Sequence, residues 1–277
     1  SAEPDRRSGG AELLGSEGRS GAIAHLCTME RRPFVLSGGG ARGIAHLGVL
    51  MALEEEGIVP SAISGTSAGA LLGAYIAAGL SPARTTELLR EEWRIHHTRR
   101  KVLRGEFLSQ RRIGEFLRDT LPCTTFEELR IPFHVSVTDL ERGGQRIFSS
   151  GPLIPTLLAA CAVPVVFPPV VIDNIAYVDG GLSNNLPIEP FNDRRAEVVA
   201  VYVNPLPEYQ AQRSLRRTLD RTFHLSFREM VKRSAEGCHL YIEPPGLSRY
   251  GMFDLRHAAS IQQVGYDHTK RMMRERR

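Results

Sequence analysis

The sequence predicts an α/β fold whose central strands run parallel, and the order of elements after residue 29 carries this prediction. Pro33–Ser37 is an apolar run typical of a buried strand, and Ala41–Glu56 repeats apolar residues at every third position, as one face of a helix does. Ser61–Ser64 is a second short strand, followed by the apolar helix Ala70–Gly79. Strand, helix, strand and helix in this order imply parallel strands joined by a right-handed crossover.

Cap residues mark the ends of the helices. Gly57 is a natural C-terminal cap for the first helix, and Ser81-Pro82 begins a third helix with serine as the cap and proline at the first position. A long basic amphipathic helix is expected over Arg213–Ala235. Further strands are expected at Pro132–Asp139, Gln145–Ser149, Ile175–Val178 and Glu197–Val203.

The composition is that of a globular protein with one domain. The 277 residues are 42% apolar and 24% charged, and the four cysteines are scattered, as in a cytoplasmic protein with reduced thiols. Residues 1–28 lack helical or strand periodicity, so we expect a flexible leader or tail there and a single domain over residues 29–277. Two uncharged runs, 62–80 and 152–172, contain several glycines or prolines, which favours buried interior over a membrane span.

Positive charge is concentrated towards the carboxyl terminus. Residues 213–277 contain 14 Lys and Arg against 7 Asp and Glu. Basic faces can meet an anionic membrane or nucleic acid, although a solvated helix face is the commoner explanation. Aromatic residues are not interleaved with the cations, so no nucleic-acid partner is expected. Peripheral contact with an anionic membrane is favoured by the apolar face of residues 213–233, which consists of Leu215, Leu219, Phe223, Phe227 and Met230.

The segment Gly65-Thr66-Ser67-Ala68-Gly69 has the pattern G-x-S-x-G between a strand and a helix. A serine nucleophile needs its hydroxyl on a sharp turn, clear of neighbouring side chains, and glycines two positions before and after it provide that clearance. The sequence context therefore makes Ser67 the candidate nucleophile.

The glycine loop Gly38–Gly43 has three possible functions. It satisfies the dinucleotide pattern G-x-G-x-x-G, but the next strand ends at Gly65-Thr66 without the acid that holds a ribose. A phosphate-binding loop fails because no Gly-Lys-Ser/Thr follows the first glycines. The third function, an oxyanion hole of converging backbone N–H groups, fits a serine nucleophile in the next loop.

The general base is expected to be an aspartate rather than a histidine. None of the nine histidines occupies a loop after a late strand, and His46, on the first helix, is better explained as structural. Asp179 ends a predicted strand and precedes Gly180-Gly181, so its carboxylate lies at a strand-to-loop junction. Such a carboxylate can accept the Ser67 proton as attack proceeds.

The glycine loop, the serine turn and Asp179-Gly180-Gly181 together resemble the patatin-like phospholipase family. Ala160–Pro169 resembles its proline-rich block, and Leu182–Pro187 is similar to the segment that follows its aspartate. The resemblance covers about residues 32–274 and implies a three-layer α/β/α sandwich with a mainly parallel sheet. It also implies a compact, bacterial-type member with residues 94–121 as a cap segment.

The resemblance assigns a role to each candidate residue. Ser67 is implied as nucleophile and Asp179 as base, with the backbone of Gly39, Gly40 and Arg42 as the oxyanion hole. No metal and no cofactor is implied. The motifs are completed by Gly38, Gly43, Gly65, Gly69, Gly180 and Gly181.

The expected activity is hydrolysis of fatty-acyl carboxylic esters, as by an esterase, phospholipase A or lysophospholipase. Acyl transfer or thioester cleavage by the same two residues is an alternative, and a lipid-binding protein without turnover is another. The expected location is the cytoplasm, with peripheral contact at the inner membrane surface.

Overall fold

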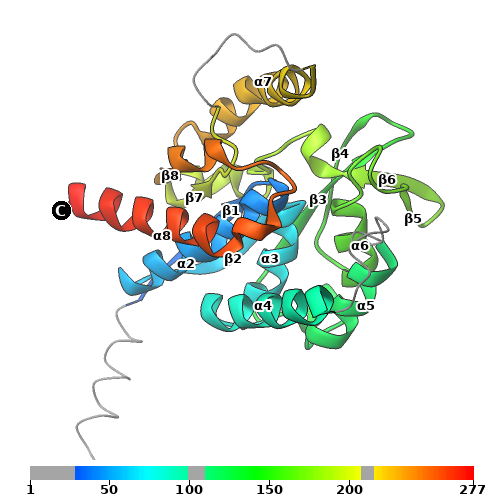
Figure 1. The fold of residues 1–277 in the computed structure, drawn as a ribbon, viewed down its shortest axis with the longest axis horizontal. Coiled ribbons are helices and arrows are strands. Elements are labelled where there is room, and N and C mark those ends of the chain that lie inside the picture. Colours follow the sequence, from blue (N-terminus) through cyan, green and yellow to red (C-terminus); the bar gives the residue numbers. More distant parts are fainter. Residues whose placement is uncertain (1–28, 99–109, 207–214) are drawn as a thin grey trace, which may run out of the picture.

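The computed structural model describes residues 29–98, 110–206 and 215–277, and it contains one eight-stranded sheet between helices (Figure 1). The expected leader or tail, residues 1–28, lies outside the described residues. The strands in sheet order are β5 (Val170–Ile172), β6 (Ile175–Asp179), β3 (Phe133–Asp139), β2 (Ile58–Thr66), β1 (Glu30–Leu36), β7 (Val199–Val201) and β8 (Leu240–Ile242), and β4 (Gly144–Phe148) also pairs with β3.

The sheet is mainly parallel, as predicted. The pairs β3–β2, β2–β1, β1–β7 and β7–β8 are parallel. At one edge the strands reverse, because β4 and β6 are both antiparallel to β3, and β5 forms an antiparallel pair with β6. This antiparallel edge was not predicted.

The helices lie on both faces of the sheet (Figure 1). The described helices are α2 (Ala45–Glu55), α3 (Ala68–Ala77), α4 (Pro82–Thr98), α5 (Gln110–Thr120), α6 (Leu153–Ala160), α7 (Leu215–Ala235) and α8 (Ala258–Glu275). The first predicted helix is divided, because Gly40–Ile44 forms a 3-10 turn before α2 begins. Helices α5 and α6 and strands β5 and β8 were not predicted.

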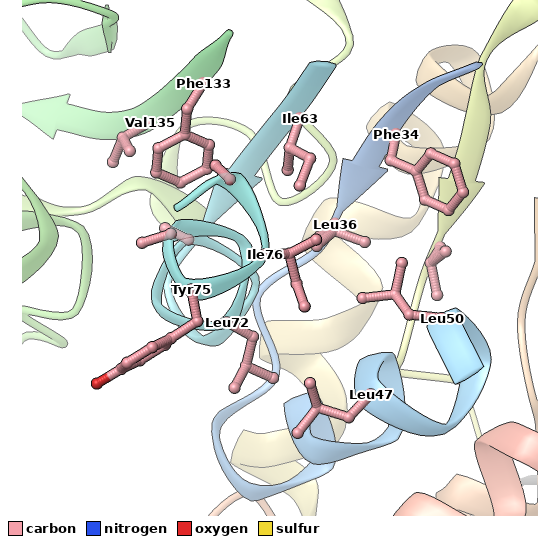
Figure 2. Close-up of a cluster of buried hydrophobic side chains, with 14 of the residues drawn as sticks. Phe34, Leu36, Leu47, Leu50, Ile63, Leu72, Tyr75, Ile76, Phe133 and Val135 are labelled. Atoms are coloured by element: carbon pink, nitrogen blue, oxygen red, sulfur yellow. The ribbon is translucent and has the colours of Figure 1, made fainter. Parts of the chain in front are cut away.

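Alternating residues of the strands supply the two halves of the core. Phe34 and Leu36 of β1 pack with α2 and α3 on one face, where Figure 2 shows them with Leu47 and Leu72. Val35, between them, belongs to a second cluster with Val231 of α7 on the opposite face. This period of two is what a strand buried on both faces requires. The predicted three-layer α/β/α arrangement is confirmed.

The predicted helix boundaries are confirmed by their caps. Gly57 follows α2 with a φ of 79°, which favours glycine. The hydroxyl of Ser81 accepts a hydrogen bond from the Arg84 N–H at 3.1 Å, at the start of α4. The uncharged runs lie in β2 and α3 and in α6 and β5. Across the described ranges, no helix is long and apolar enough to cross a membrane.

Candidate active site

Sheet register brings the serine turn and the aspartate to the same level. Thr66, at the end of β2, pairs with Ser136 of β3, and the next residue of β3, Val137, pairs with Asp179. Asp179 reaches this edge because β6 runs antiparallel to β3 and ends where β3 faces the end of β2. The glycine loop follows β1, the neighbour of β2 on the other side.

Ser67 occupies a strained turn between β2 and α3. Its φ of 51° and ψ of −125° are unfavourable for a residue with a side chain. Gly65 and Gly69 permit the turn, since a Cβ on Gly65 would lie 2.8 Å from the Gly69 carbonyl carbon, and one on Gly69 would lie 2.3 Å from the Leu36 carbonyl oxygen. The two glycines of the motif are therefore required by close backbone approach.

Asp179 is buried beside the serine. The Ser67 side chain lies near its carboxylate, and the Gly181 N–H donates a hydrogen bond to its Oδ1 at 2.8 Å. Burial raises the pKa of Asp179 from 3.8 to about 6, against the opposing effect of Ser67 and the Gly181 N–H, which lower it. A carboxylate with such a pKa is ionised at neutral pH and can still take up a proton from an attacking hydroxyl.

The glycine loop lies beside the serine. A Cβ on Gly38 would lie 3.0 Å from the Ser67 Cβ. The Ala41 N–H donates to the Met252 carbonyl at 2.7 Å, and the Arg42 N–H donates to the Gly39 carbonyl at 3.1 Å. Within the described residues, no hydrogen bond uses the N–H of Gly39 or Gly40. Of the three expected oxyanion donors, two are therefore available and the Arg42 N–H is already engaged in the turn.

These residues line one apolar cavity of about 860 Å³. Its polar groups include Ser67, Asp179, the loop Gly38–Ala41, Asn185 and Asn204. Its apolar walls come from α3, α5, the segment after α6 and the segment before α8, and they include Leu71, Leu72, Tyr75, Ile113, Phe116, Leu117, Val163, Phe167, Met252 and Phe253. A cavity of this size and character suits a long apolar ligand.

Comparison with known proteins identifies the fold and its motifs. A family model described as patatin-like phospholipase matches residues 34–192, which include the glycine loop, Ser67 and Asp179. The chain belongs to the patatin-like phospholipase family. The family predicted from the three motifs is thereby confirmed.

Two relatives and one structure indicate how far the similarity extends. An uncharacterized NTE family protein of Mycobacterium tuberculosis is 34% identical over 183 residues, 63% of this chain and 49% of the relative. Neuropathy target esterase sws of Drosophila melanogaster is 30% identical over 190 residues, 65% of this chain and 13% of that protein. The chain thus spans about half the length of the mycobacterial relative. VipD from Legionella pneumophila has a TM-score of 0.56 at 16% identity over 88% of this chain and 67% of its own, which shows a shared fold.

His46 has a structural position in this patatin-like site. Its Nε2 donates to the Ser37 carbonyl oxygen at 2.8 Å, and the ring is fully buried. Burial lowers the pKa of His46 to about 4, so the ring is neutral at physiological pH. It does not line the cavity. Among the described residues, no group of His, Cys, Asp and Glu side chains could hold a metal ion.

Two asparagines that were not among the predicted site residues contact the glycine loop. Asn185 accepts a hydrogen bond from the Gly38 N–H, and Asn204 donates one to the Gly38 carbonyl. Asn185 lies within the resemblance segment 182–187, and Asn204 follows a predicted buried strand at its carboxyl end. Open α/β sheets place their ligands at the carboxyl ends of strands, so the position of Asn204 was the sequence feature that could have indicated a role in the site.

Proposed function

We propose that residues 29–277 form a lipid acyl hydrolase that cleaves fatty-acyl carboxylic esters with Ser67 and Asp179. The observation that carries this proposal is that Ser67 and the buried carboxylate of Asp179, whose pKa the serine side chain lowers, lie together on the wall of one apolar cavity. The strained φ at Ser67 supports it, since such strain is concentrated at functional sites. The family match is consistent with this chemistry.

The proposed reaction has two halves. The Ser67 oxygen bonds to the ester carbonyl carbon while its proton passes to Asp179, and the carbonyl oxygen becomes an oxyanion. The C–O bond to the alcohol then breaks, and the alcohol leaves with the proton from Asp179. In the second half a water molecule attacks the acyl-serine, Asp179 accepts its proton, and the fatty acid leaves as Ser67 regains a proton.

We propose the N–H groups of Gly39 and Gly40 as the donors that stabilise the oxyanion. They lie at the end of β1, beside the nucleophile, and are unused by the described residues. Arg42, expected from the resemblance as a third donor, contributes instead through its buried side chain, whose Nε donates to the Tyr250 carbonyl at 2.7 Å. This contact ties the turn Gly40–Ile44 to the segment before α8.

Residues of the expected cap segment, 94–121, line part of the cavity. Its described part is the end of α4 and helix α5, and α5 contributes Ile113, Phe116 and Leu117 to the apolar wall. We propose that α5 holds the acyl chain. Residues 99–109 of this segment lie outside the described residues.

The membrane contact expected at α7 is better placed at the cavity mouth. Of the predicted face, Phe227 is buried and not available to a bilayer, and Met230 is 40% exposed. By contrast, Val165 is fully exposed and Phe253 is 51% exposed, and both line the cavity together with the exposed cations Arg90 and Arg256. We propose that these residues meet an anionic lipid surface.

Vesicle sedimentation tests this placement. Phe253→Ser is expected to weaken binding of the protein to anionic vesicles. Leu140→Ser is the matched control, because Leu140 is 48% exposed but does not line the cavity. Equal binding by both variants and the wild type would remove the membrane proposal without affecting the hydrolase.

The hydrolase itself is tested on p-nitrophenyl esters of increasing chain length, lysophospholipid and diacyl phospholipid. Ser67→Ala and Asp179→Asn are each expected to lower kcat at least ~1,000-fold. Asp173→Asn is the control, because Asp173 is exposed in the β5–β6 turn with a φ of 50°, which Asn tolerates. Full activity in Ser67→Ala would refute the proposal, and ester formation with added alcohols in preference to hydrolysis would favour the acyltransferase alternative.

A further inference from the structure

The glycine loop needs external anchors to act as an oxyanion hole. Gly38, Gly39 and Gly40 have no side chains, and glycine loses more conformational freedom on folding than any other residue. An oxyanion hole works because its donors are already aimed when charge develops. The contacts that hold these three peptide groups therefore decide how well the N–H groups are aimed.

Asn204 fixes the peptide group that carries the Gly39 N–H. Its Nδ2 donates to the Gly38 carbonyl oxygen at 2.6 Å, and its side chain is almost fully buried. Because a trans peptide is planar, the Gly38 carbonyl and the Gly39 N–H point in opposite directions. Holding the carbonyl oxygen on one side therefore fixes the direction of the Gly39 N–H on the other.

Asn185 fixes the preceding peptide group. Its Oδ1 accepts from the Gly38 N–H at 3.0 Å, and its amide also lies near the hydroxyl of the buried Tyr202, whose pKa it lowers. Since Oδ1 faces Gly38, the NH₂ group is the part of the amide that acts on Tyr202. The tyrosine oxygen thus favours this orientation, because the opposite one would place the NH₂ group against the Gly38 N–H.

The two amides come from distant parts of the chain. Asn185 is 147 residues and Asn204 is 166 residues from Gly38 in sequence. The Oδ1 of Asn204 has no partner in the described part of the chain, so the contact with Gly38 is the interaction that compensates for burying this amide. Neither contact contributes to a helix or to a strand pair, which separates them from the general framework of the fold.

We propose that Asn185 and Asn204 are positioning residues that clamp Gly38 from both sides and aim the Gly39 N–H at the reacting carbonyl oxygen. This inference rests on the proposed hydrolase. Both amides also line the cavity, but its apolar walls come from other residues. The inference therefore predicts that loss of either amide weakens stabilisation of the oxyanion while the apolar walls that bind the acyl chain stay intact. Loss of either amide is therefore expected to lower kcat and to leave KM nearly unchanged.

Asn184 supplies a matched control. It is as buried as the other two, but its hydrogen bonds stay within its own loop, to the Leu186 N–H at 3.0 Å and to Glu189 at 2.6 Å. Asn184→Ala therefore removes a buried amide without removing a contact to the glycine loop. Tyr202→Phe is the milder test, since it deletes one hydroxyl and keeps the ring.

The experiment measures kcat and KM for a p-nitrophenyl ester, affinity for an alkyl trifluoromethyl ketone, and thermal unfolding. The ketone forms a tetrahedral adduct with a serine, and its oxyanion reports on the same donors. Asn204→Ala and Asn185→Ala are each expected to lower kcat and ketone affinity by between ~10-fold and ~100-fold with KM within about twofold, less than loss of a whole donor. Tyr202→Phe is expected to lower kcat and ketone affinity by about threefold or more.

The outcomes separate the clamp from the hydrolase. Asn184→Ala is expected to lose stability and to keep kcat and ketone affinity within about twofold. Equal losses of kcat in all three Ala variants, or losses in KM alone, would overturn the clamp. If an Ala variant does not fold, an unchanged kcat and ketone affinity in Tyr202→Phe would overturn it. A wild type that neither hydrolyses esters nor binds the ketone would overturn the proposed hydrolase, and the clamp with it.

Discussion

Replacing Asp179 by Asn is expected to inactivate the protein and, at neutral pH, to stabilise it. The pKa of Asp179 is raised from 3.8 to about 6, because the carboxylate is buried. One pKa unit is worth about 1.4 kcal/mol, so ionised Asp179 costs the folded state about 3 kcal/mol. Asn has nearly the same shape, its Oδ1 can still accept from the Gly181 N–H, and it carries no charge. Stabilisation by up to about 3 kcal/mol is therefore expected.

The sign of the pH dependence follows from the direction of the shift. Between about pH 4 and pH 6 the folded wild type binds more protons than the unfolded chain, so its stability falls as pH rises through this window. Asp179→Asn has no carboxyl group at this position, so its stability does not fall for this reason as pH rises. The difference in unfolding free energy between variant and wild type should therefore grow from near zero at about pH 4 to its full value above pH 7.

His46 contributes an opposite slope that must be removed. Its pKa is lowered to about 4, so it makes stability rise with pH between about 4 and 6.5. Because His46 is present in both proteins, its contribution cancels when the variant is compared with the wild type at each pH. Urea unfolding followed by circular dichroism at several pH values provides the comparison.

The activity profile gives a second measurement of the same group. Asp179 must be ionised to accept the Ser67 proton, so kcat/KM is expected to rise with an apparent pKa near 6 and to fall to about one tenth of its plateau at about pH 5. An aspartate of ordinary pKa would remain more than nine-tenths ionised there. An activity plateau that extends down to pH 5, together with a stability difference between Asp179→Asn and the wild type that is no larger at pH 8 than at pH 4, would refute the reasoning.

Three further predictions concern the nucleophile turn and its surroundings. Ser67→Gly is expected to be more stable than Ser67→Ala by about 1 kcal/mol in urea unfolding, because the φ of 51° strains any residue with a Cβ, and equal stabilities would contradict this. His46→Gln is expected to keep at least about a third of kcat, since the neutral ring contacts Ser37 and not the cavity, and a ~100-fold loss would restore a histidine mechanism. Gly43→Ala is expected to destabilise the fold by about 1–3 kcal/mol, because its Cβ would lie 2.4 Å from the Ala68 Cβ. An unchanged unfolding midpoint would contradict this and show that the turn of Gly43 and the start of α3 can move apart without cost.

The sequence was sufficient for features whose cause is local. Gly65 is required by its close approach to Gly69, four positions away, and the motif around Ser67 reflects that requirement directly, although Gly69 also approaches the distant Leu36 carbonyl. The alternation of buried residues in β1, with Val35 facing one way and its neighbours the other, is equally local. Cap residues such as Gly57 and Ser81 identified helix ends for the same reason.

Features that depend on contacts between distant residues leave no local pattern in the sequence, so they could not be predicted from it. The antiparallel course of β6, which brings Asp179 level with the serine turn, is set by pairing with β3. The clamp on Gly38 joins side chains far apart in the sequence. On α7, an apolar stripe indicates that one face avoids water, but it does not indicate whether a membrane or the sheet covers that face. Phe227 of this stripe is buried within the protein.

Labelling with a fluorophosphonate probe tests the central claim, that Ser67 is a nucleophile activated by Asp179, most directly. Peptide mapping of the folded wild type is expected to find a single modified residue, Ser67, with labelling that slows as pH falls below about 6. Asp179→Asn should react far more slowly, and unfolded protein should not react. A folded protein that stays unlabelled, or that is labelled at another residue with undiminished esterase activity in Ser67→Ala, would contradict the claim.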